Sequence, residues 1–186
     1  PYCSYPLIVE IYNFCQHDCL YCFTKHKETW HNKAMQRKKR GFNKILDILD
    51  IGSLKAIFSG EQVQSKKDLL LKSFLDQRYA IQIGAQTDPG GRLEKKYGRT
   101  FELLKLLKKD GNYYPVRIST KGSAFKNGKY LDIFNSYRQA TILISIISID
   151  NNILKKIEPN TPQVKEQLSL QNLLPKTSVK LGLSLR

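Results

Sequence analysis

The feature that most constrains the fold is the run TILISIISI at 141–149, which is almost wholly apolar and rich in β-branched residues. A strand of this composition is typical of a parallel sheet that is covered on both faces. Similar runs occupy 7–14, 54–60, 79–86, 115–120 and 178–185. The chain is therefore predicted to contain a sheet built largely from buried strands.

Helical patterns lie between these runs. The clearest follows Thr-Asp-Pro-Gly-Gly, where an apolar face repeats at steps of four and three residues up to Asp110-Gly111. This face consists of Leu93, Tyr97, Phe101, Leu104 and Leu107. It predicts one continuous helix that starts near residue 91. Shorter helices are predicted over 66–77, 130–137 and 163–174.

Strands that alternate with helices imply parallel βαβ units, and so an α/β fold. A complete eight-unit barrel needs about 250 residues, whereas this chain has 186 and stops within a predicted strand. The prediction is therefore a partial, open (β/α)6-type TIM-like barrel that lacks its C-terminal strand, formed by a single domain over 1–186.

Three of the four cysteines, Cys15, Cys19 and Cys22, follow the first predicted strand with the spacing C-x3-C-x2-C. Convergent thiolates select zinc, copper(I) or an iron–sulfur cluster. A structural zinc site needs four closed ligands, for which Cys3 and His17 are candidates. Three cysteine ligands without a fourth suit a cubane iron–sulfur cluster, whose last iron is left open for a substrate or cofactor. The polar residues between the cysteines argue against simple packing, and His17 is expected to face solvent.

The charge is the unusual bulk property. Thirty-one Lys and Arg residues against sixteen Asp and Glu residues give a net charge of +15. Such an excess favours an anionic partner, most often nucleic acid, although a lysine-rich proteome would produce the same excess. A basic insertion at 25–44 follows the cysteine loop and offers donors to phosphates, unless it is a solvated helix face. Its candidate nucleic-acid contacts are Lys25, Lys27, Lys33, Arg37, Lys38, Lys39 and Arg40.

The cysteine motif, with the aromatic Tyr21 before its third cysteine, resembles that of the radical S-adenosylmethionine (SAM) superfamily. Further segments resemble its spore photoproduct lyase-like (DNA repair photolyase-like) branch: IQIGAQTDPGGRLEKKYG, the strand ending in Thr-Lys, and ILISIISIDNNILKKIEPNTP with its Glu-Pro. The likeness covers most of 7–186. The turn GGR departs from the Tyr and second Pro usual in that branch.

The resemblance implies a [4Fe–4S] cluster held by Cys15, Cys19 and Cys22, whose open iron binds SAM. An electron from a partner such as flavodoxin or ferredoxin would cleave SAM to a 5′-deoxyadenosyl radical, which would abstract hydrogen from the substrate. The residues implied at SAM are Tyr21, Thr87, Asp88, Lys121 and Ser145.

Each implied SAM contact has a simpler alternative. Asp88 would contact the ribose or amino group of SAM, or would cap the helix near 91. Lys121 would contact the carboxylate or ribose, or would be a solvated turn residue. Ser145 would bond the ribose, or the neighbouring backbone, because a buried hydroxyl needs a partner.

The predicted substrate is DNA or RNA, undergoing repair or modification, and a peptide or small molecule is the first alternative. The second alternative is a non-catalytic, zinc-containing nucleic-acid-binding protein with Cys3, Cys15, Cys19 and Cys22 as ligands. No apolar run approaches the roughly 20 residues of a membrane span, and the first residues do not form a signal peptide. With only four cysteines, we expect a cytoplasmic protein.

Overall fold

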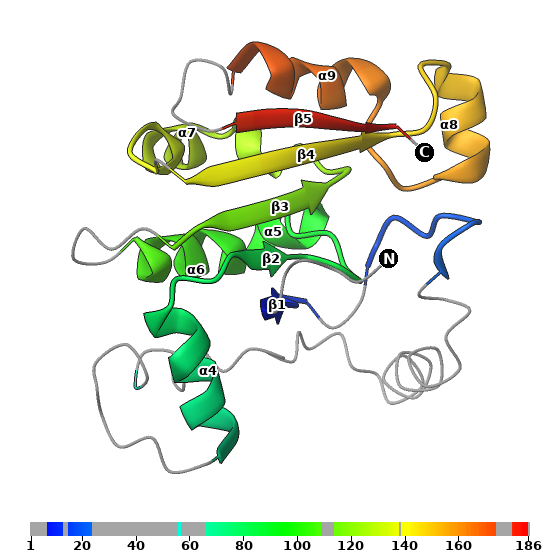
Figure 1. Cartoon of the computed structure of the whole chain (residues 1–186). Coiled ribbons are helices and arrows are strands. Elements are labelled where there is room, and N and C mark those ends of the chain that lie inside the picture. Colours follow the sequence, from blue (N-terminus) through cyan, green and yellow to red (C-terminus); the bar gives the residue numbers. More distant parts are fainter. Residues whose placement is uncertain are drawn as a thin grey trace.

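The computed structural model describes residues 7–12, 15–23, 56, 66–108, 114–137, 139–173 and 180–185. Five strands form one sheet in the order β1-β2-β3-β4-β5, and every neighbouring pair is parallel (Figure 1). The strands are β1 (Leu7–Val9), β2 (Ile81–Ile83), β3 (Val116–Thr120), β4 (Ala140–Ile146) and β5 (Lys180–Leu185). The predicted α/β class with a parallel sheet is confirmed.

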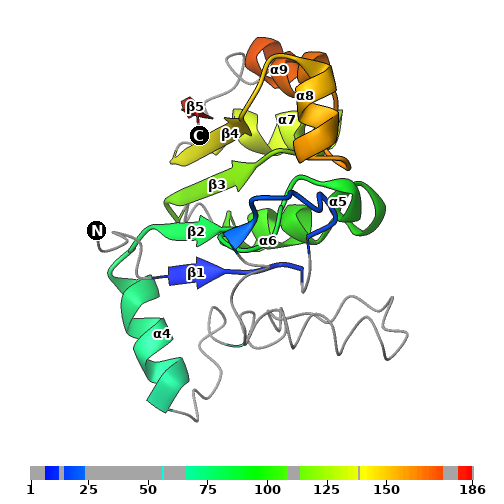
Figure 2. The ribbon, with the colours of Figure 1, turned by 90° about the vertical axis from the view of Figure 1, so that its right-hand side faces the viewer.

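The described helices follow the strands in turn. They are α4 (Lys66–Asp76), α5 (Arg92–Tyr97), α6 (Arg99–Leu107), the 3-10 helix η2 (Ala124–Lys126), α7 (Gly128–Asn135), α8 (Asn151–Ile157) and α9 (Val164–Leu173). Figure 2 shows α5, α6, α7, α8 and α9 on one side of the sheet, while α4 lies beyond the β1 edge.

The prediction that the strand at 141–149 is covered on both faces holds for only part of β4. In β4, Ile142 and Ile144 are fully buried. On the other face Ser145 is also buried, whereas Thr141 and Leu143 are half-buried. The same alternation runs along β3. An apolar run thus forms a strand with one helix-covered face and one face that is more open.

The strand predicted at 54–60 lies outside the described residues except for Ala56, whose backbone is helical. At Ala56 the prediction is therefore wrong. Strand β1 pairs directly with β2, with Leu7 opposite Ile81, so no further strand separates them. The predicted strand 7–14 is shortened to Leu7–Val9, because the chain then turns into the cysteine loop.

The single helix predicted from near 91 to Asp110 is instead two helices, α5 and α6. Gly98 separates them in a left-handed conformation (φ 68°) that glycine adopts without steric cost. The carboxylate of Glu94 then accepts hydrogen bonds from the N–H groups of Thr100 (2.8 Å) and Phe101 (3.0 Å) at the start of α6. These bonds satisfy two donors that a helix start leaves open.

The side chain of Glu94 is fully buried and forms hydrogen bonds with several separate elements of the core. Besides the α6 start, its carboxylate accepts the hydroxyls of Tyr12, after β1, and Tyr130, in α7. Both rings are buried within the apolar core. A buried carboxylate is tolerated only when its oxygens are paired in this way.

The buried tyrosine pair predicts that the protein is sensitive to alkaline pH. Burial, and then the charge of Glu94, raises the pKa of both Tyr12 and Tyr130 above the ordinary value of 10.0. Because the folded-state pKa is raised, the stabilisation is complete below pH 10 and is lost as the pH rises further. The free energy of unfolding should fall above pH 10 by about 2.7 kcal/mol per pH unit from the two groups.

Urea unfolding at pH 9, 10 and 11 measures this slope. The variant Tyr12→Phe with Tyr130→Phe should flatten it, whereas Tyr97→Phe, at an exposed ring in α5, should leave it unchanged. An identical slope in the double variant and the parent would contradict the assignment.

Candidate functional site

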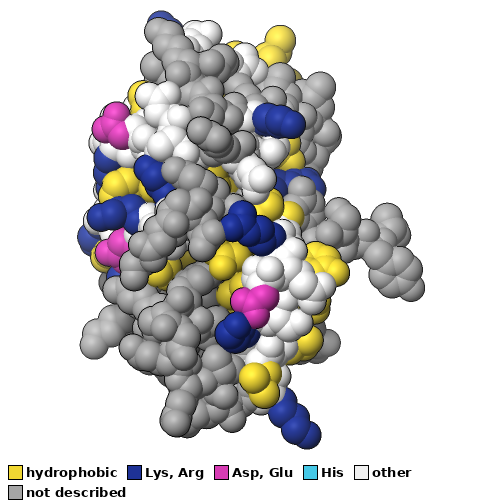
Figure 3. Space-filling view, turned by 60° about the vertical axis from the view of Figure 1, so that its left-hand side comes forward, with side chains coloured by type: hydrophobic (Ala, Val, Ile, Leu, Met, Phe, Trp, Pro, Cys, Tyr) yellow, Lys and Arg dark blue, Asp and Glu magenta, His cyan; other side chains and the backbone are white. Residues whose placement is uncertain are grey.

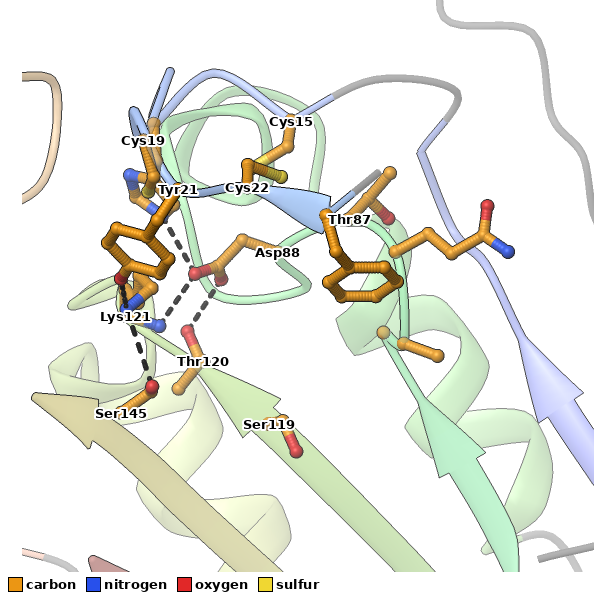
Figure 4. Close-up of a pocket in the computed structure, with 15 residues that line it drawn as sticks. Cys15, Cys19, Tyr21, Cys22, Thr87, Asp88, Ser119, Thr120, Lys121 and Ser145 are labelled. Atoms are coloured by element: carbon orange, nitrogen blue, oxygen red, sulfur yellow. Dashed lines mark hydrogen bonds and ion pairs between the residues drawn. The ribbon is translucent and has the colours of Figure 1, made fainter. Parts of the chain in front are cut away.

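A pocket with both polar and apolar lining opens at the carboxyl ends of the strands, where the loops after β1, β2 and β3 meet the end of β4 (Figure 4). Because parallel strands all end at the same edge, loops far apart in sequence are brought together there. Its lining includes every cluster and cofactor residue that the sequence predicted: Cys15, Cys19, Tyr21, Cys22, Thr87, Asp88, Lys121 and Ser145.

The cysteine loop is held against the end of α8 and the segment that follows it. The N–H of Leu20 donates to the carbonyl of Ile157 (2.9 Å), and the N–H of Asn160 donates to the carbonyl of His17 (3.3 Å). Cys19 is buried. Burial, and then the negative charge of Asp88, raises the pKa of the Cys15 thiol to about 12. This thiol keeps its proton at neutral pH unless a bound metal takes its place.

Asp88 ties the cysteine loop to two other loops through four hydrogen bonds. Figure 4 shows those that join it to Thr120 and Lys121. One oxygen accepts the Gly90 N–H (2.8 Å) and the Thr120 hydroxyl (2.6 Å). The other accepts the Lys121 N–H (2.6 Å) and lies 2.7 Å from Nε2 of His17. Burial alone would raise the pKa of Asp88, but the charge of His17 and these bonds hold it below its usual range.

Two sequence-based expectations are corrected here. Asp88 does not cap α5, because the N-cap position is Gly91 and Asp88 closes the preceding turn. His17 is not solvent-facing, since only 2% of it is exposed. Its Nδ1 lies 3.2 Å from the carbonyl oxygen of Asn160. A polar residue is buried in this loop because both ring nitrogens find partners.

Lys121 and Tyr21 meet over a buried carboxylate, that of Glu158. The ammonium of Lys121 lies 2.5 Å from Oε1 of Glu158, 2.8 Å from the Tyr21 hydroxyl and 3.3 Å from Oγ of Ser145. The Tyr21 hydroxyl also donates to Glu158. Lys121 is therefore not a solvated turn residue. The hydroxyl of Ser145 has the side chain of Lys121 as a partner. The lysine's charge is held at the pocket by a fixed counter-ion.

Glu158 and Glu10 are the structural residues of the site that sequence reasoning missed. Glu10 follows β1, and its carboxylate accepts the N–H groups of Ala85 (2.6 Å), Gln86 (2.7 Å) and Thr87 (3.0 Å) and the Thr87 hydroxyl (2.6 Å). The sequence held a signal for Glu10, because an acid directly after the apolar run LIV needs hydrogen-bonding partners if it is buried. For Glu158 the signal was the Glu-Pro pair after the fourth strand, noted above only as part of the resemblance.

The loops after β2 and β3 pack backbone to backbone. A Cβ atom on Gly122 would lie only 1.9 Å from the carbonyl oxygen of Gly90, so no larger residue fits there without moving the loop. This close approach brings the Lys121 N–H within reach of Asp88.

The predicted nucleic-acid contacts Lys25, Lys27, Lys33, Arg37, Lys38, Lys39 and Arg40 lie outside the described residues, as does Cys3. On the face shown in Figure 3, the described Lys and Arg side chains are scattered, with Asp and Glu between them, and form no continuous basic patch. The charge excess therefore has no single location on the described part of that face.

Within the described ranges, no three His, Cys, Asp or Glu side chains form a group that could hold a single metal ion. The three cysteines share one pocket without meeting that requirement. No helix among the described residues is long and apolar enough to cross a membrane.

The fold is similar to that of two solved structures of spore photoproduct lyase. One is a double mutant with bound AdoMet and dinucleoside spore photoproduct (15% identity, TM-score 0.65), and the other is a cysteine-to-serine mutant (14% identity, TM-score 0.62). Each match covers 97% of this chain and 45% of the other. The chain thus spans less than half the length of these proteins.

No protein-family profile matches the sequence, and no curated protein matches it. The structural likeness confirms the resemblance stated above at the level of the fold. It is independent of the motif argument, because at about 15% identity it rests on the arrangement of the backbone.

Proposed function

We propose that the chain is the core domain of a radical SAM enzyme acting on nucleic acid, folded as a partial, open TIM-like barrel over 1–186. The observation that carries the proposal is that the C-x3-C-x2-C loop, Thr87-Asp88, Lys121 and Ser145 converge on one pocket at the carboxyl ends of the strands. A solved protein of the same fold has AdoMet bound.

The ligands of a [4Fe–4S] cluster would be Cys15, Cys19 and Cys22. When bound, the cluster supplies the electron that cleaves SAM to a 5′-deoxyadenosyl radical. The three thiols line one pocket, and soft thiolate ligands are those that an iron–sulfur cluster requires.

The side chains at the pocket divide into contacting and positioning roles. Lys121, with Tyr21 and Ser145 beside it, would donate to the carboxylate or ribose of SAM. Thr87 would present its backbone carbonyl, because its N–H and its hydroxyl both already donate to Glu10. Asp88 already accepts four hydrogen bonds, which fill the acceptor positions of a carboxylate. It would act by holding Lys121 and the cysteine loop.

The substrate and partners follow from charge and chemistry. The net charge of +15 and the dinucleoside ligand of the similar lyase support DNA or RNA as substrate. A flavodoxin or ferredoxin in the cytoplasm would supply the electron. A peptide or small-molecule substrate would instead leave activity nearly unchanged between 50 and 200 mM salt, a range in which phosphate-driven binding weakens steeply.

Anaerobic reconstitution of the full chain with iron and sulfide tests the proposal. We expect a brown protein with about four irons and matching sulfide. A colourless protein that retains one zinc after purification would contradict the cluster. It would favour instead the zinc-containing binding protein, with Cys3 as fourth ligand.

A further inference from the structure

A buried ion pair forms part of one wall of the pocket. The ammonium of Lys121 and Oε1 of Glu158 are 2.5 Å apart. The Glu158 side chain is completely shielded from solvent, whereas 14% of the Lys121 side chain is exposed. Lys121 lines the pocket and Glu158 does not. A ligand in the pocket would therefore meet the ammonium, with the carboxylate behind it.

Several hydrogen bonds hold the Glu158 carboxylate in this place. The N–H of Glu158 donates to the carbonyl of Leu154 (2.6 Å) at the end of α8. Its carbonyl accepts both the N–H (3.1 Å) and the hydroxyl (2.9 Å) of Thr161. The Tyr21 hydroxyl, which comes from the cysteine loop, donates to its Oε1. The negative charge of Glu158 is thus fixed relative to the pocket.

Lys121 is held as firmly as its partner. Its N–H donates to Asp88 (2.6 Å), and its carbonyl accepts Nε2 of Gln167 (2.9 Å), a fully buried residue of α9. Its ammonium also contacts the hydroxyls of Tyr21 (2.8 Å) and Ser145 (3.3 Å) at one end of the pocket (Figure 4). The two charges therefore form one preorganised pair.

The pair sets the charge that a ligand meets. A fixed ammonium attracts the carboxylate of a ligand and repels a ligand cation, and a carboxylate beside the ammonium offsets both effects. Because the pair is buried, salt screens it much less than it screens surface charges. SAM carries a carboxylate and the permanent positive charge of its sulfonium. Its thioether analogue, S-adenosylhomocysteine, has the same carboxylate but lacks the sulfonium charge.

We propose that Glu158 is a specificity-determining residue, whose buried charge lets the pocket accept the positive charge of a sulfonium ligand. The proposal rests on the proposed function and specifies how its site distinguishes SAM from the thioether. Without the charge of Glu158, the same wall would carry one more positive charge and would favour the thioether. Lys121 remains the residue that contacts the ligand, and Glu158 acts from behind it.

Equilibrium binding of SAM and of S-adenosylhomocysteine to the reconstituted full chain, without reductant, tests the proposal. We expect Glu158→Gln to weaken the binding of SAM about fivefold or more relative to the binding of the thioether. The amide keeps the size of the side chain and one accepting oxygen, so the variant isolates the charge. Glu158→Asp keeps the charge and should preserve the ratio of the two affinities, even where both affinities fall.

Glu102→Gln is the matched control. Glu102 is also paired with a cation, Arg99 (2.7 Å), but its side chain is 48% exposed on α6. The same loss of one negative charge at this solvent-screened position should leave the ratio of affinities unchanged.

The parent protein supplies a second measurement that does not depend on the folding of a variant. Its ratio of SAM affinity to thioether affinity should change by less than about twofold between about 0.1 and 1 M salt, because a buried charge is screened little. A steep change with salt would assign the preference to surface charges and would overturn the role of Glu158.

An unchanged ratio in Glu158→Gln, or equal changes in Glu158→Gln and Glu102→Gln, would overturn the role of Glu158 and leave the proposed function intact. A parent protein that binds neither ligand would contradict both. A ratio that shifts as expected in a protein that holds no iron would contradict the proposed function and leave the role of Glu158 standing.

Discussion

Replacing any one of Cys15, Cys19 or Cys22 with alanine should abolish cluster binding and SAM cleavage. Two remaining thiolates would not hold the proposed three-cysteine cluster, so the iron content after reconstitution should fall from about four to near zero. The rate of 5′-deoxyadenosine release should fall by about a thousandfold or more, since the chemistry belongs to the cofactor. Iron analysis, visible spectroscopy and chromatography of the products measure both effects.

Cys3→Ala is the matched control for these variants. It removes a thiol that the proposed cluster does not use, so iron content and cleavage should match those of the parent. If loss of Cys3 is as damaging as loss of Cys19, the site has four protein ligands. That result would favour structural zinc over a cluster with an open iron.

Asp88→Asn should destabilise the folded protein strongly although it preserves the shape of the side chain. An amide keeps only one accepting oxygen, so its NH2 group faces either the donors of Gly90 and Thr120 or the N–H of Lys121. It also leaves His17 without its buried counter-ion. We expect a loss of about 3–5 kcal/mol in the free energy of unfolding, the range found when one partner of a buried pair is removed.

Urea unfolding measures this loss, and Asp132→Asn is the matched control. Asp132 is exposed on α7, so its replacement should change stability by less than about 0.5 kcal/mol. Equal effects of the two replacements would show that Asp88 does not join the three loops.

Patterns of apolar residues predicted the class of fold because a parallel sheet depends on them directly. The runs that became β3, β4 and β5 overlap their predicted ranges, and their parallel order follows from the helices between them. The break at Gly98 was missed because the apolar face continues through it. Only the placement of Glu94 beneath the start of α6 shows why two helices are formed.

The pocket residues were predictable because each ends or follows a strand, and parallel strands end at one edge. Their contacts were not predictable, because Asp88 to His17 and Lys121 to Glu158 join positions 71 and 37 residues apart. The exposure of His17 and the capping role of Asp88 were misjudged for this reason. A residue's local sequence does not reveal a partner on another loop.

Release of 5′-deoxyadenosine is the measurement that separates radical SAM chemistry from every alternative. The reconstituted chain would be incubated without oxygen with dithionite and SAM, and the product followed against a sample lacking dithionite. We predict reduction-dependent 5′-deoxyadenosine from the parent and none from Cys19→Ala. A protein that carries about four irons but releases no 5′-deoxyadenosine would contradict the proposal that this pocket cleaves SAM.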